Sequence, residues 1–359
     1  MIQIGIIGTG RLGICQALCL DSVGYDVYCY DINKELMHNI KNKTLQTNEP
    51  FVAEMLRNSK LKVAESEEFI LKTCSVILVF IQTPSDTSGE YDHSYIDMFV
   101  SKCASMKQDI KKVIAICSTV MPEYTDSIVD KLKDYDVCYN PTFIAQGSII
   151  DNLINPNLIL IGGHSVEAMN IIESMHKKVV RNDASIHKMT PLEAEVCKIS
   201  INCFITTKIS FANMIGDLLI SKGYEPSSVL KAIGSDSRIG SKCLQYGYGF
   251  GGPCFPRDNR ALNYYGKKEG MDLSLCTTTD KLNRDHLLNQ YKIMKETQDS
   301  ITFTLVSYKD NSDILEESQK LKLAIMLADS GINVVIKERA HIIKKLKEEY
   351  ADKFIYEEI

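Results

Sequence analysis

The sequence predicts an α/β fold organised around a doubly wound parallel sheet. Three observations support this class. Short apolar runs alternate with helical stretches, and such runs are typical of strands that a parallel sheet buries on both faces. A glycine-rich turn links the first run to the first helical stretch, and a strand–helix–strand pattern returns near the C-terminus.

The first element is a strand at residues 2–7, followed by the turn Gly8-Thr9-Gly10-Arg11-Leu12-Gly13 and a helix. A second strand at residues 27–30 ends on Asp31. This order is the dinucleotide-binding fingerprint in its required context. The glycines let the backbone approach a pyrophosphate, and the N–H groups at the helix start face the anion. Asp31 would bind the ribose hydroxyls, which favours NAD over NADP.

Further strands are predicted at residues 76–81, 113–116, 137–139 and 158–161. Ligands of such sheets bind at the carboxyl ends of the strands. Polar residues stand there in three places, although each is also compatible with ordinary turn chemistry. These segments are Gln82-Thr83-Pro84, Cys117-Ser118-Thr119-Val120 and Asn140-Pro141-Thr142.

Residues 191–222 read as one long helix that could join two domains and pair with its copy in a dimer. Lys198 and Asn202 share one face of it, although a lysine at such a position is more often a solvated edge residue. After residue 299 a strand is expected at 301–307, a helix at 316–329, a strand at 334–337 and a basic helix at 341–347.

The loop at residues 247–258 is the most informative segment, because four glycines precede Cys254. Glycines let the backbone crowd a ligand and leave the sulfur accessible. Arg257 could lower the thiol pKa, and Asp258 could hold a base or a water. The alternative is a glycine-rich loop whose cysteine has no catalytic role.

Composition excludes several other classes. The 359 residues include 41 basic and 46 acidic side chains, so a net charge of −5 argues against nucleic-acid binding. We expect no membrane span, no signal peptide and, because the 12 cysteines lack Cys-x-x-Cys spacing, no metal site. Reduced thiols in a cytoplasmic protein are the expectation.

Together the motifs resemble the UDP-glucose 6-dehydrogenase branch of the nucleotide-sugar dehydrogenases, which form the UDP-glucose/GDP-mannose dehydrogenase family. The resemblance covers nearly the whole chain. Besides the N-terminal fingerprint, it rests on the following segments: Thr83-Pro84, Ser118-Thr119-Val120, Asn140-Pro141-x-Phe143-x-x-x-Gly147-Ser148, Lys198-x-x-x-Asn202, Arg238-Ile239-Gly240 and Gly249-Phe250-Gly251-Gly252-x-Cys254-Phe255-Pro256-x-Asp258.

The resemblance implies two Rossmann-like doubly wound domains joined by a long central helix, with a homodimer formed through that helix. It places the NAD-binding domain at residues 1–188 and the central helical domain with the cysteine loop at 189–298. A UDP-sugar-binding domain, shorter than in the family, would follow at 299–359.

The resemblance also implies four-electron oxidation of UDP-glucose to UDP-glucuronate with two NAD reduced. Cys254 would attack the C6 aldehyde, and Lys198 and Asn202 would stabilise negative charge on the C6 oxygen. Asp258 would support proton transfer, and Thr119 would position water and nicotinamide. The remaining implied contacts are Thr83, Pro84, Thr119 and Gln146 for the cofactor, and Thr142, Phe143, Gln146, Lys198, Asn202, Arg238, Gly251 and Lys309 for the sugar nucleotide.

Four positions depart from the family pattern. Thr142 and Gln146 stand where the family carries glutamates, so thioester hydrolysis could be slow. Cys243 replaces an aromatic residue, and Glu316 replaces an arginine, which would weaken binding of the dinucleotide. Two alternatives therefore remain: the same chemistry on UDP-N-acetylhexosamine, GDP-mannose or another nucleotide sugar, and a non-catalytic nucleotide-sugar binder.

Overall fold

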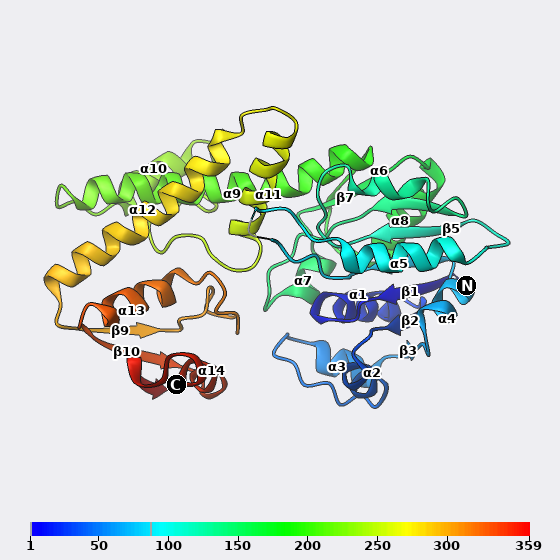
Figure 1. Ribbon diagram of the computed structural model, residues 1–359, viewed down its shortest axis with the longest axis horizontal. Helices are drawn as coiled ribbons and strands as arrows, with labels where there is room; N and C mark the ends of the chain where they lie inside the picture. Colours follow the sequence, from blue (N-terminus) through cyan, green and yellow to red (C-terminus); the bar gives the residue numbers. More distant parts are fainter. Residues whose placement is uncertain (1, 87) are drawn as a thin grey trace. The chain divides into compact units, whose positions relative to one another are not determined.

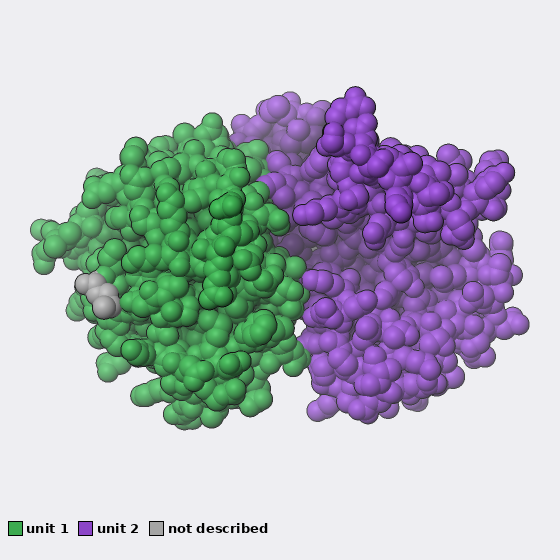
Figure 2. Space-filling model, turned by 180° about the vertical axis from the view of Figure 1, so that it is seen from behind, with its two compact units in different colours: residues 1–198 green, residues 199–359 purple. Residues whose placement is uncertain are grey.

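The computed structural model describes residues 2–86 and 88–359, and the chain divides into two compact units. Unit 1 comprises residues 1–198 and unit 2 comprises residues 199–359 (Figure 2). The 30-residue helix α9 (Pro191–Ile220) contains the boundary, so its first two turns belong to unit 1.

Unit 1 is an eight-stranded sheet with the order β3-β2-β1-β4-β5-β6-β7-β8 (Figure 1). The predicted α/β class is therefore confirmed. The two edge strands, the two-residue β3 and the five-residue β8, were not anticipated from the sequence. The strands are β1 (Gln3–Ile7), β2 (Asp26–Tyr30), β3 (Lys62–Val63), β4 (Val76–Val79), β5 (Lys112–Ile116), β6 (Tyr135–Tyr139), β7 (Leu158–Gly163) and β8 (Ser185–Met189).

One pairing in this sheet differs from the all-parallel prediction, because β7 runs antiparallel to β6. The connection between them contains only the six-residue helix α7 (Ile149–Ile154). Such a helix is about 9 Å long and cannot return the chain across the sheet. Strand β7 therefore starts near the edge where β6 ends and runs back, and β8 then pairs parallel to β7.

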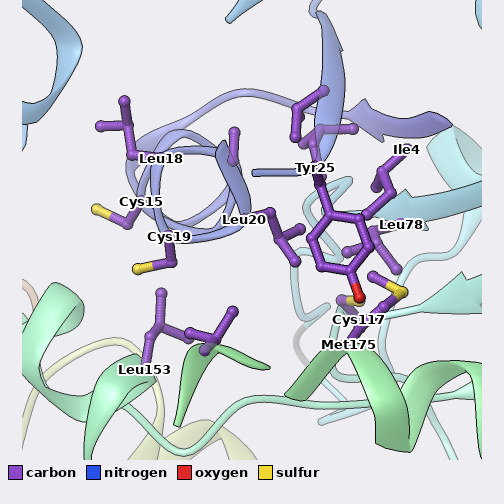
Figure 3. Packing of buried hydrophobic residues seen from close by; sticks show 14 of the residues in the cluster. Ile4, Cys15, Leu18, Cys19, Leu20, Tyr25, Leu78, Cys117, Leu153 and Met175 are labelled. Carbon is purple, nitrogen blue, oxygen red and sulfur yellow. The ribbon is translucent and has the colours of Figure 1, made fainter. Parts of the chain in front are cut away.

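Helices cover both faces of the sheet, which explains why its central strands are apolar throughout. In β4, Val76 and Leu78 belong to one core cluster while Ile77 and Val79 belong to the other. Figure 3 shows part of the first cluster, to which Cys15, Leu18 and Cys19 of helix α1 and Leu153 of α7 belong. The other helices are α1 (Arg11–Ser22), α2 (Lys34–Lys41), α3 (Val52–Asn58), α4 (Glu67–Thr73), α5 (Ser94–Ser105), α6 (Tyr124–Val129) and α8 (Val166–Val179).

Unit 2, residues 199–359, contains most of α9, five further α-helices and a small parallel sheet with the order β11-β10-β9. The last strand was not anticipated from the sequence, whereas the preceding strand–helix–strand–helix pattern is confirmed. The elements are α10 (Ser227–Ser235), α11 (Phe255–Lys268), α12 (Ser274–Thr297), β9 (Ser300–Thr304), α13 (Gln319–Asp329), β10 (Asn333–Glu338), α14 (Ala340–Tyr350), the 3-10 turn η1 (Ala351–Lys353) and β11 (Ile355–Glu358).

Helix α9 is the long helix that the sequence predicted at residues 191–222. By length and composition alone it could cross a membrane, and it is the one such helix within residues 2–86 and 88–359. The sequence offered no unbroken apolar run there, because serine, threonine and asparagine interrupt it. These small polar residues lower the mean hydropathy of the helix, but the helix remains apolar on average.

Candidate active site

The glycine turn of unit 1 forms a cradle for a dinucleotide phosphate. A Cβ atom at Gly13 would lie 2.0 Å from the Gly8 carbonyl oxygen, so helix α1 packs against the turn only with glycine there. Gly10 occupies the N-cap of α1, and no side chain caps the helix. The first N–H groups of α1 therefore remain available to an anion, as the sequence predicted.

Asp31 lies beside this turn at the end of β2. Its carboxylate accepts hydrogen bonds from the backbone N–H groups of Thr9, at 2.8 Å, and Asn33, at 2.9 Å. Arg11, at the start of α1, donates to the side-chain oxygen of Gln146 at 2.9 Å. The structure thus brings together Asp31, the glycine turn and Gln146, three of the features predicted to hold NAD.

The ends of β4 and β5 meet at the same edge of the sheet. The Thr83 hydroxyl, which is buried, donates to the Thr119 carbonyl oxygen at 2.7 Å, and the Ser118 hydroxyl donates to the Ile81 carbonyl oxygen. These bonds fix the backbone that carries Thr119 and Pro84. Two of the three predicted polar strand ends, those that follow β4 and β5, are therefore bonded to each other at one edge of the sheet.

Lys198 is buried in unit 1 and holds the segment that follows β6. Its ammonium group donates to the Thr142 carbonyl oxygen at 2.8 Å and lies 4.4 Å from the centre of the Phe143 ring. The solvated-edge interpretation of Lys198 is therefore wrong. The contact uses the backbone of Thr142, so it does not depend on the side chain at this position.

Two buried carboxylates that the sequence analysis missed hold the neighbouring loops. Glu195, one turn before Lys198, accepts from the N–H groups of Glu123, at 2.7 Å, and Thr125, at 2.8 Å. Burial raises the pKa of Glu195 to about 7. Glu49 accepts from the N–H groups of residues 147 and 149 at 2.9 and 2.6 Å. For Glu195, its position one helical turn before Lys198 could have indicated a role. For Glu49, the sequence carries no such signal.

In unit 2, Cys254 stands at the N-cap of α11 and is exposed. Nine of the other cysteines are buried, and burial raises the pKa of core thiols such as Cys19 to about 12. The sequence-based separation of Cys254 from the core cysteines is therefore consistent with the structure. Cys243 is the other exposed thiol.

Asp258 connects the cysteine helix to the central helix. It is 1% exposed, and it accepts a 2.6 Å hydrogen bond from the Asn202 amide on α9. The guanidinium of Arg257 lies 3.5 Å from the other carboxylate oxygen. A second bond, from the Asn259 amide to the Thr206 hydroxyl at 2.8 Å, also joins α11 to α9. Three predicted residues, Cys254, Asp258 and Asn202, are thus connected within unit 2.

The glycine loop packs closely on the chain between β9 and α13. A Cβ atom at Gly251 would lie 2.2 Å from the Glu317 carbonyl oxygen, so only glycine fits. The N–H group of Gly252 donates to the Glu316 carbonyl oxygen at 3.2 Å. Glu316 therefore stands beside the cysteine loop with its side chain exposed.

Two predicted substrate contacts differ in their placement. Lys309 lies in the same segment as Glu316, next to Tyr308, whose ring lies within 2.5 Å of where a Gly252 Cβ atom would be. Arg238 is instead paired with Asp236 at 2.7 Å, and its side chain is 86% exposed. Its predicted role is therefore not apparent from its contacts within this chain.

Unit 1 offers a phosphate cradle, which suits the binding of a dinucleotide. Unit 2 offers an accessible thiol at a helix N-terminus and a buried carboxylate with a neutral amide donor, which suit nucleophilic attack on a carbonyl. Over the described ranges 2–86 and 88–359, no group of three or more His, Cys, Asp or Glu side chains is placed to hold a metal ion.

Comparison with known sequences gives two family matches. The NAD-binding domain of the UDP-glucose/GDP-mannose dehydrogenase family matches residues 2–180, and the central domain of the same family matches residues 192–285. The second match includes most of α9, so this long apolar helix corresponds to the central helix of that family.

Relatives and solved structures agree with these matches. A UDP-glucose 6-dehydrogenase of Bacillus subtilis is 29% identical over 98% of this chain and 80% of the relative. One from Rickettsia bellii is 27% identical over 93% of this chain and 80% of its own length. The structure of a UDP-glucose dehydrogenase from Pyrobaculum islandicum superposes with a TM-score of 0.91 at 25% identity, covering 100% of this chain and 86% of the other.

Proposed function

Because the chain belongs to the UDP-glucose/GDP-mannose dehydrogenase family, we propose that it oxidises UDP-glucose at C6 to UDP-glucuronate. Dependence on NAD and a nucleotide-sugar substrate follow from the family. The choice of UDP-glucose is supported by the relatives that carry that name. The residues assigned below extend this proposal to the mechanism.

One observation carries the assignment of the catalytic residues. The 2.6 Å bond between Asn202 and Asp258 joins the central helix to the helix that begins at the exposed Cys254. A buried carboxylate with an amide partner beside an accessible thiol is unusual in a merely structural loop, because burying such a charge is costly. Such a pair is expected where catalysis requires proton transfer and the stabilisation of a developing charge.

In the first oxidation, the C6 hydroxyl loses a proton and a hydride to become an aldehyde. Asn202 donates to the C6 oxygen as negative charge develops there, and Lys198 supplies a second donor. Asp258 accepts the proton through an ordered water. NAD, when bound at the glycine turn and Asp31, accepts the hydride of each oxidation.

In the second oxidation, the Cys254 thiolate adds to the aldehyde carbon to form the anion of a thiohemiacetal, and loss of a hydride from this anion gives a thioester. Water then attacks the thioester carbon, the C–S bond breaks, and the carboxylate leaves while the thiolate is regenerated. The resemblance to the family implies a glutamate where this chain has Thr142, and threonine supplies no carboxylate base, so we expect hydrolysis to be the slowest step.

The direct test is the stoichiometry of purified protein with UDP-glucose and excess NAD. Two NADH per UDP-glucose, with UDP-glucuronate as product, support the proposal, and no NADH at any substrate concentration would contradict it. Cys254→Ser should abolish carboxylate formation while still binding UDP-glucose in calorimetry, which controls for folding. A panel with UDP-N-acetylhexosamines and GDP-mannose decides between sugars, and binding without NADH would indicate a non-catalytic binder.

Slow hydrolysis of the thioester predicts that a covalent adduct accumulates on Cys254. Quenching during turnover should trap a sugar-nucleotide adduct, seen as a mass increase on the peptide that contains Cys254. Thr142→Glu should restore a carboxylate and reduce the adduct. Fast turnover without any adduct in the unmodified protein would dismiss rate-limiting hydrolysis while leaving the overall reaction intact.

We also propose that the protein is a cytoplasmic homodimer paired through α9. The helix exposes Phe204, Phe211, Met214 and Leu218, whose side chains are 65%, 41%, 42% and 57% accessible. The spacing 204, 211, 218 places three of them on one face, and such an apolar stripe is typical of a covered surface. Phe211→Asp should shift the mass in light scattering from dimer to monomer; an unchanged mass would exclude this interface.

A further inference from the structure

A histidine is hydrogen-bonded next to the segment that binds the Lys198 ammonium group. The Nε2 of His176, on α8, lies 2.8 Å from the Oδ1 of Asn140, the residue that directly follows β6. Asn140 is buried, and its amide nitrogen donates to the Leu160 carbonyl oxygen of β7 at 2.8 Å. Its backbone N–H group donates to the Ile116 carbonyl oxygen of β5 at 2.8 Å. His176 thus adds a bond from α8 to a residue that two strands already hold.

The partners of Asn140 determine which groups donate. A carbonyl oxygen can only accept, so the nitrogen of the Asn140 amide must face Leu160 and its oxygen must face His176. The amide oxygen is itself only an acceptor, so Nε2 of His176 carries a proton. Burial lowers the pKa of His176 to about 4, so at neutral pH the imidazole is neutral and its single N–H group is the one that Asn140 accepts.

One residue separates Asn140 from the carbonyl group that binds Lys198. This residue is Pro141, whose ring fixes its own φ and restricts the backbone of Asn140 before it. A change in the orientation of Asn140 is therefore passed on to Thr142, because free rotation between them is limited. The Thr142 carbonyl oxygen accepts from the Lys198 ammonium group at 2.8 Å. Since an ammonium group carries three N–H groups, the position of this oxygen sets where the other two point.

A small cavity beside the segment gives it room to move. Its volume is about 10 Å³, at the lower limit for one water molecule, and Asn140, Thr142 and His176 line it together. The rest of its wall includes four residues labelled in Figure 3, namely Leu20, Leu78, Cys117 and Met175. Without the bond from His176, the buried oxygen of Asn140 would lose a partner, which is unfavourable. The amide would then turn to find another partner, and Thr142 would shift with it.

We propose that His176 is a positioning residue for Lys198. Its bond to Asn140 fixes the Thr142 carbonyl oxygen, and this oxygen holds the ammonium group in the orientation from which it donates to the C6 oxygen of the substrate. A small displacement of such a donor has a large effect on the rate, because its bond matters most in the transition state. The inference rests on the proposed function in taking Lys198 as that donor.

The first experiment removes the N–H group of His176 and then restores it. His176→Leu has no donor, so kcat with UDP-glucose should fall by about 10-fold or more. The dissociation constants of NAD and UDP-glucose should change by less than about threefold, because the lost stabilisation belongs to the transition state. His176→Gln keeps an N–H group and should recover about half or more of the wild-type kcat. An unchanged kcat in His176→Leu, or equal losses in both variants, overturns the proposal.

A neighbouring side chain provides the matched control for packing. Met175 lines the same cavity and has no N–H or O–H group. Met175→Leu changes the cavity wall without removing a donor, so kcat should stay at the wild-type value. A loss as large as that of His176→Leu would show that packing around the cavity, and not the bond to Asn140, sets the rate, and would overturn the proposal.

A double variant tests the route through Lys198. Lys198→Met removes the ammonium group, so adding His176→Leu to it should lower the residual kcat by less than about twofold. The residual rate is measured as NADH fluorescence with enzyme in excess over UDP-glucose. A further loss as large as in the single His176→Leu variant would mean that His176 acts by another route, which contradicts the proposal.

A crystal structure of His176→Leu tests the geometry without turnover. Compared with wild type, the Thr142 carbonyl oxygen should be displaced, and the Lys198 Nζ should move with it or lose the bond. Unchanged positions of both atoms would overturn the proposal. If this variant does not fold, His176→Asn, whose shorter amide does not reach Asn140, replaces it in each measurement. Absence of UDP-glucose oxidation by the wild type would contradict the proposed function alone, because the crystal structure still decides the positioning.

Discussion

The two sheets share a local parallel topology but present different chemistry at their strand ends. The order β3-β2-β1 in unit 1 is repeated as β11-β10-β9 in unit 2. After β1, the chain turns through glycines and starts α1 at an N-cap, Gly10, that has no side-chain cap. After β9 comes a longer loop, and Ser318 caps α13 by accepting from the Leu321 N–H group.

The acidic residues at the ends of β2 and β10 also differ in whether a ligand can reach them. Asp31, after β2, is partly exposed and binds backbone N–H groups next to the glycine turn. Glu338, at the end of β10, is fully buried and paired with Arg339 at 2.9 Å. Only the first sheet therefore leaves helix N–H groups and a carboxylate available to a dinucleotide. Topology sets where a ligand can bind, and the turn chemistry decides whether one does.

The largest expected effect comes from adding a side chain at the glycine turn between β1 and α1. Gly13→Ala places a methyl group 2.0 Å from the Gly8 carbonyl oxygen, so α1 must shift. NAD affinity should fall by about 100-fold or more, and the melting temperature should fall with it. At Gly10, no protein atom lies within 4 Å of an added Cβ. Gly10→Ala should thus weaken NAD binding, measured by calorimetry, at an unchanged melting temperature; equal melting temperatures for both variants would refute this distinction.

A second prediction concerns buried titratable groups of unit 1. Burial lowers the pKa of His176 to about 4 and raises the pKa of Glu195 to about 7. Between pH 4 and 6.5 the unfolded chain binds more protons at His176, so this group makes stability rise with pH. Between pH 4.5 and 7 the folded chain binds more protons at Glu195, so this group makes stability fall with pH. The two slopes oppose each other where they overlap.

Removing either group should therefore expose the other slope, by up to about 3 kcal/mol. His176→Gln should make the stability of unit 1 fall from pH 4.5 to 7, and Glu195→Gln should make it rise from pH 4 to 6.5. Native-state hydrogen exchange of unit 1 amides, with unit 2 amides as the internal reference, measures both slopes. Identical pH profiles for the two variants would show that these groups do not set the pH dependence.

Exchanging the strand-end acids tests the comparison more finely. Asp31→Asn keeps the side-chain volume but loses a charged acceptor for the ribose hydroxyls, so NAD affinity should fall by about 1.5–3 kcal/mol. Discrimination against NADP should also decrease. Glu338→Gln, the matched change in the second sheet, should leave NAD affinity unaltered. Calorimetric titrations of both variants decide the matter, and a similar loss in both would show that the sheets are not functionally distinct.

Much of this contrast is local in sequence, which is why it could be predicted. Gly8 to Gly13 and Asp31 stand in one contiguous motif, and the all-apolar residues of β4 indicate a strand buried on both faces. The exposed Cys254 was likewise marked by its neighbouring glycines. Such features depend on the order of residues along a short segment.

The missed features depend on contacts between distant segments. Glu49 binds the N–H groups near residue 148 across about one hundred positions, and His286 binds Asp217 from another helix. The antiparallel β7 was missed because the length of α7, not the strand itself, sets its direction. No local pattern records which backbone group a lone buried acid or histidine will meet.

The smallest expected effect is at the cap of α13. Ser318→Ala removes the side-chain oxygen that accepts from Leu321 N–H and the hydroxyl that donates to the Val306 carbonyl oxygen at 2.7 Å. Unit 2 should lose about 1 kcal/mol of stability in urea unfolding. NAD affinity should stay constant. The dinucleotide site of unit 1 combines an uncapped helix, a glycine turn and an accessible carboxylate, and the variant would supply only the uncapped helix. A gain in NAD affinity would mean that an open helix N-terminus alone suffices, and the distinction between the sheets would then reduce to one serine.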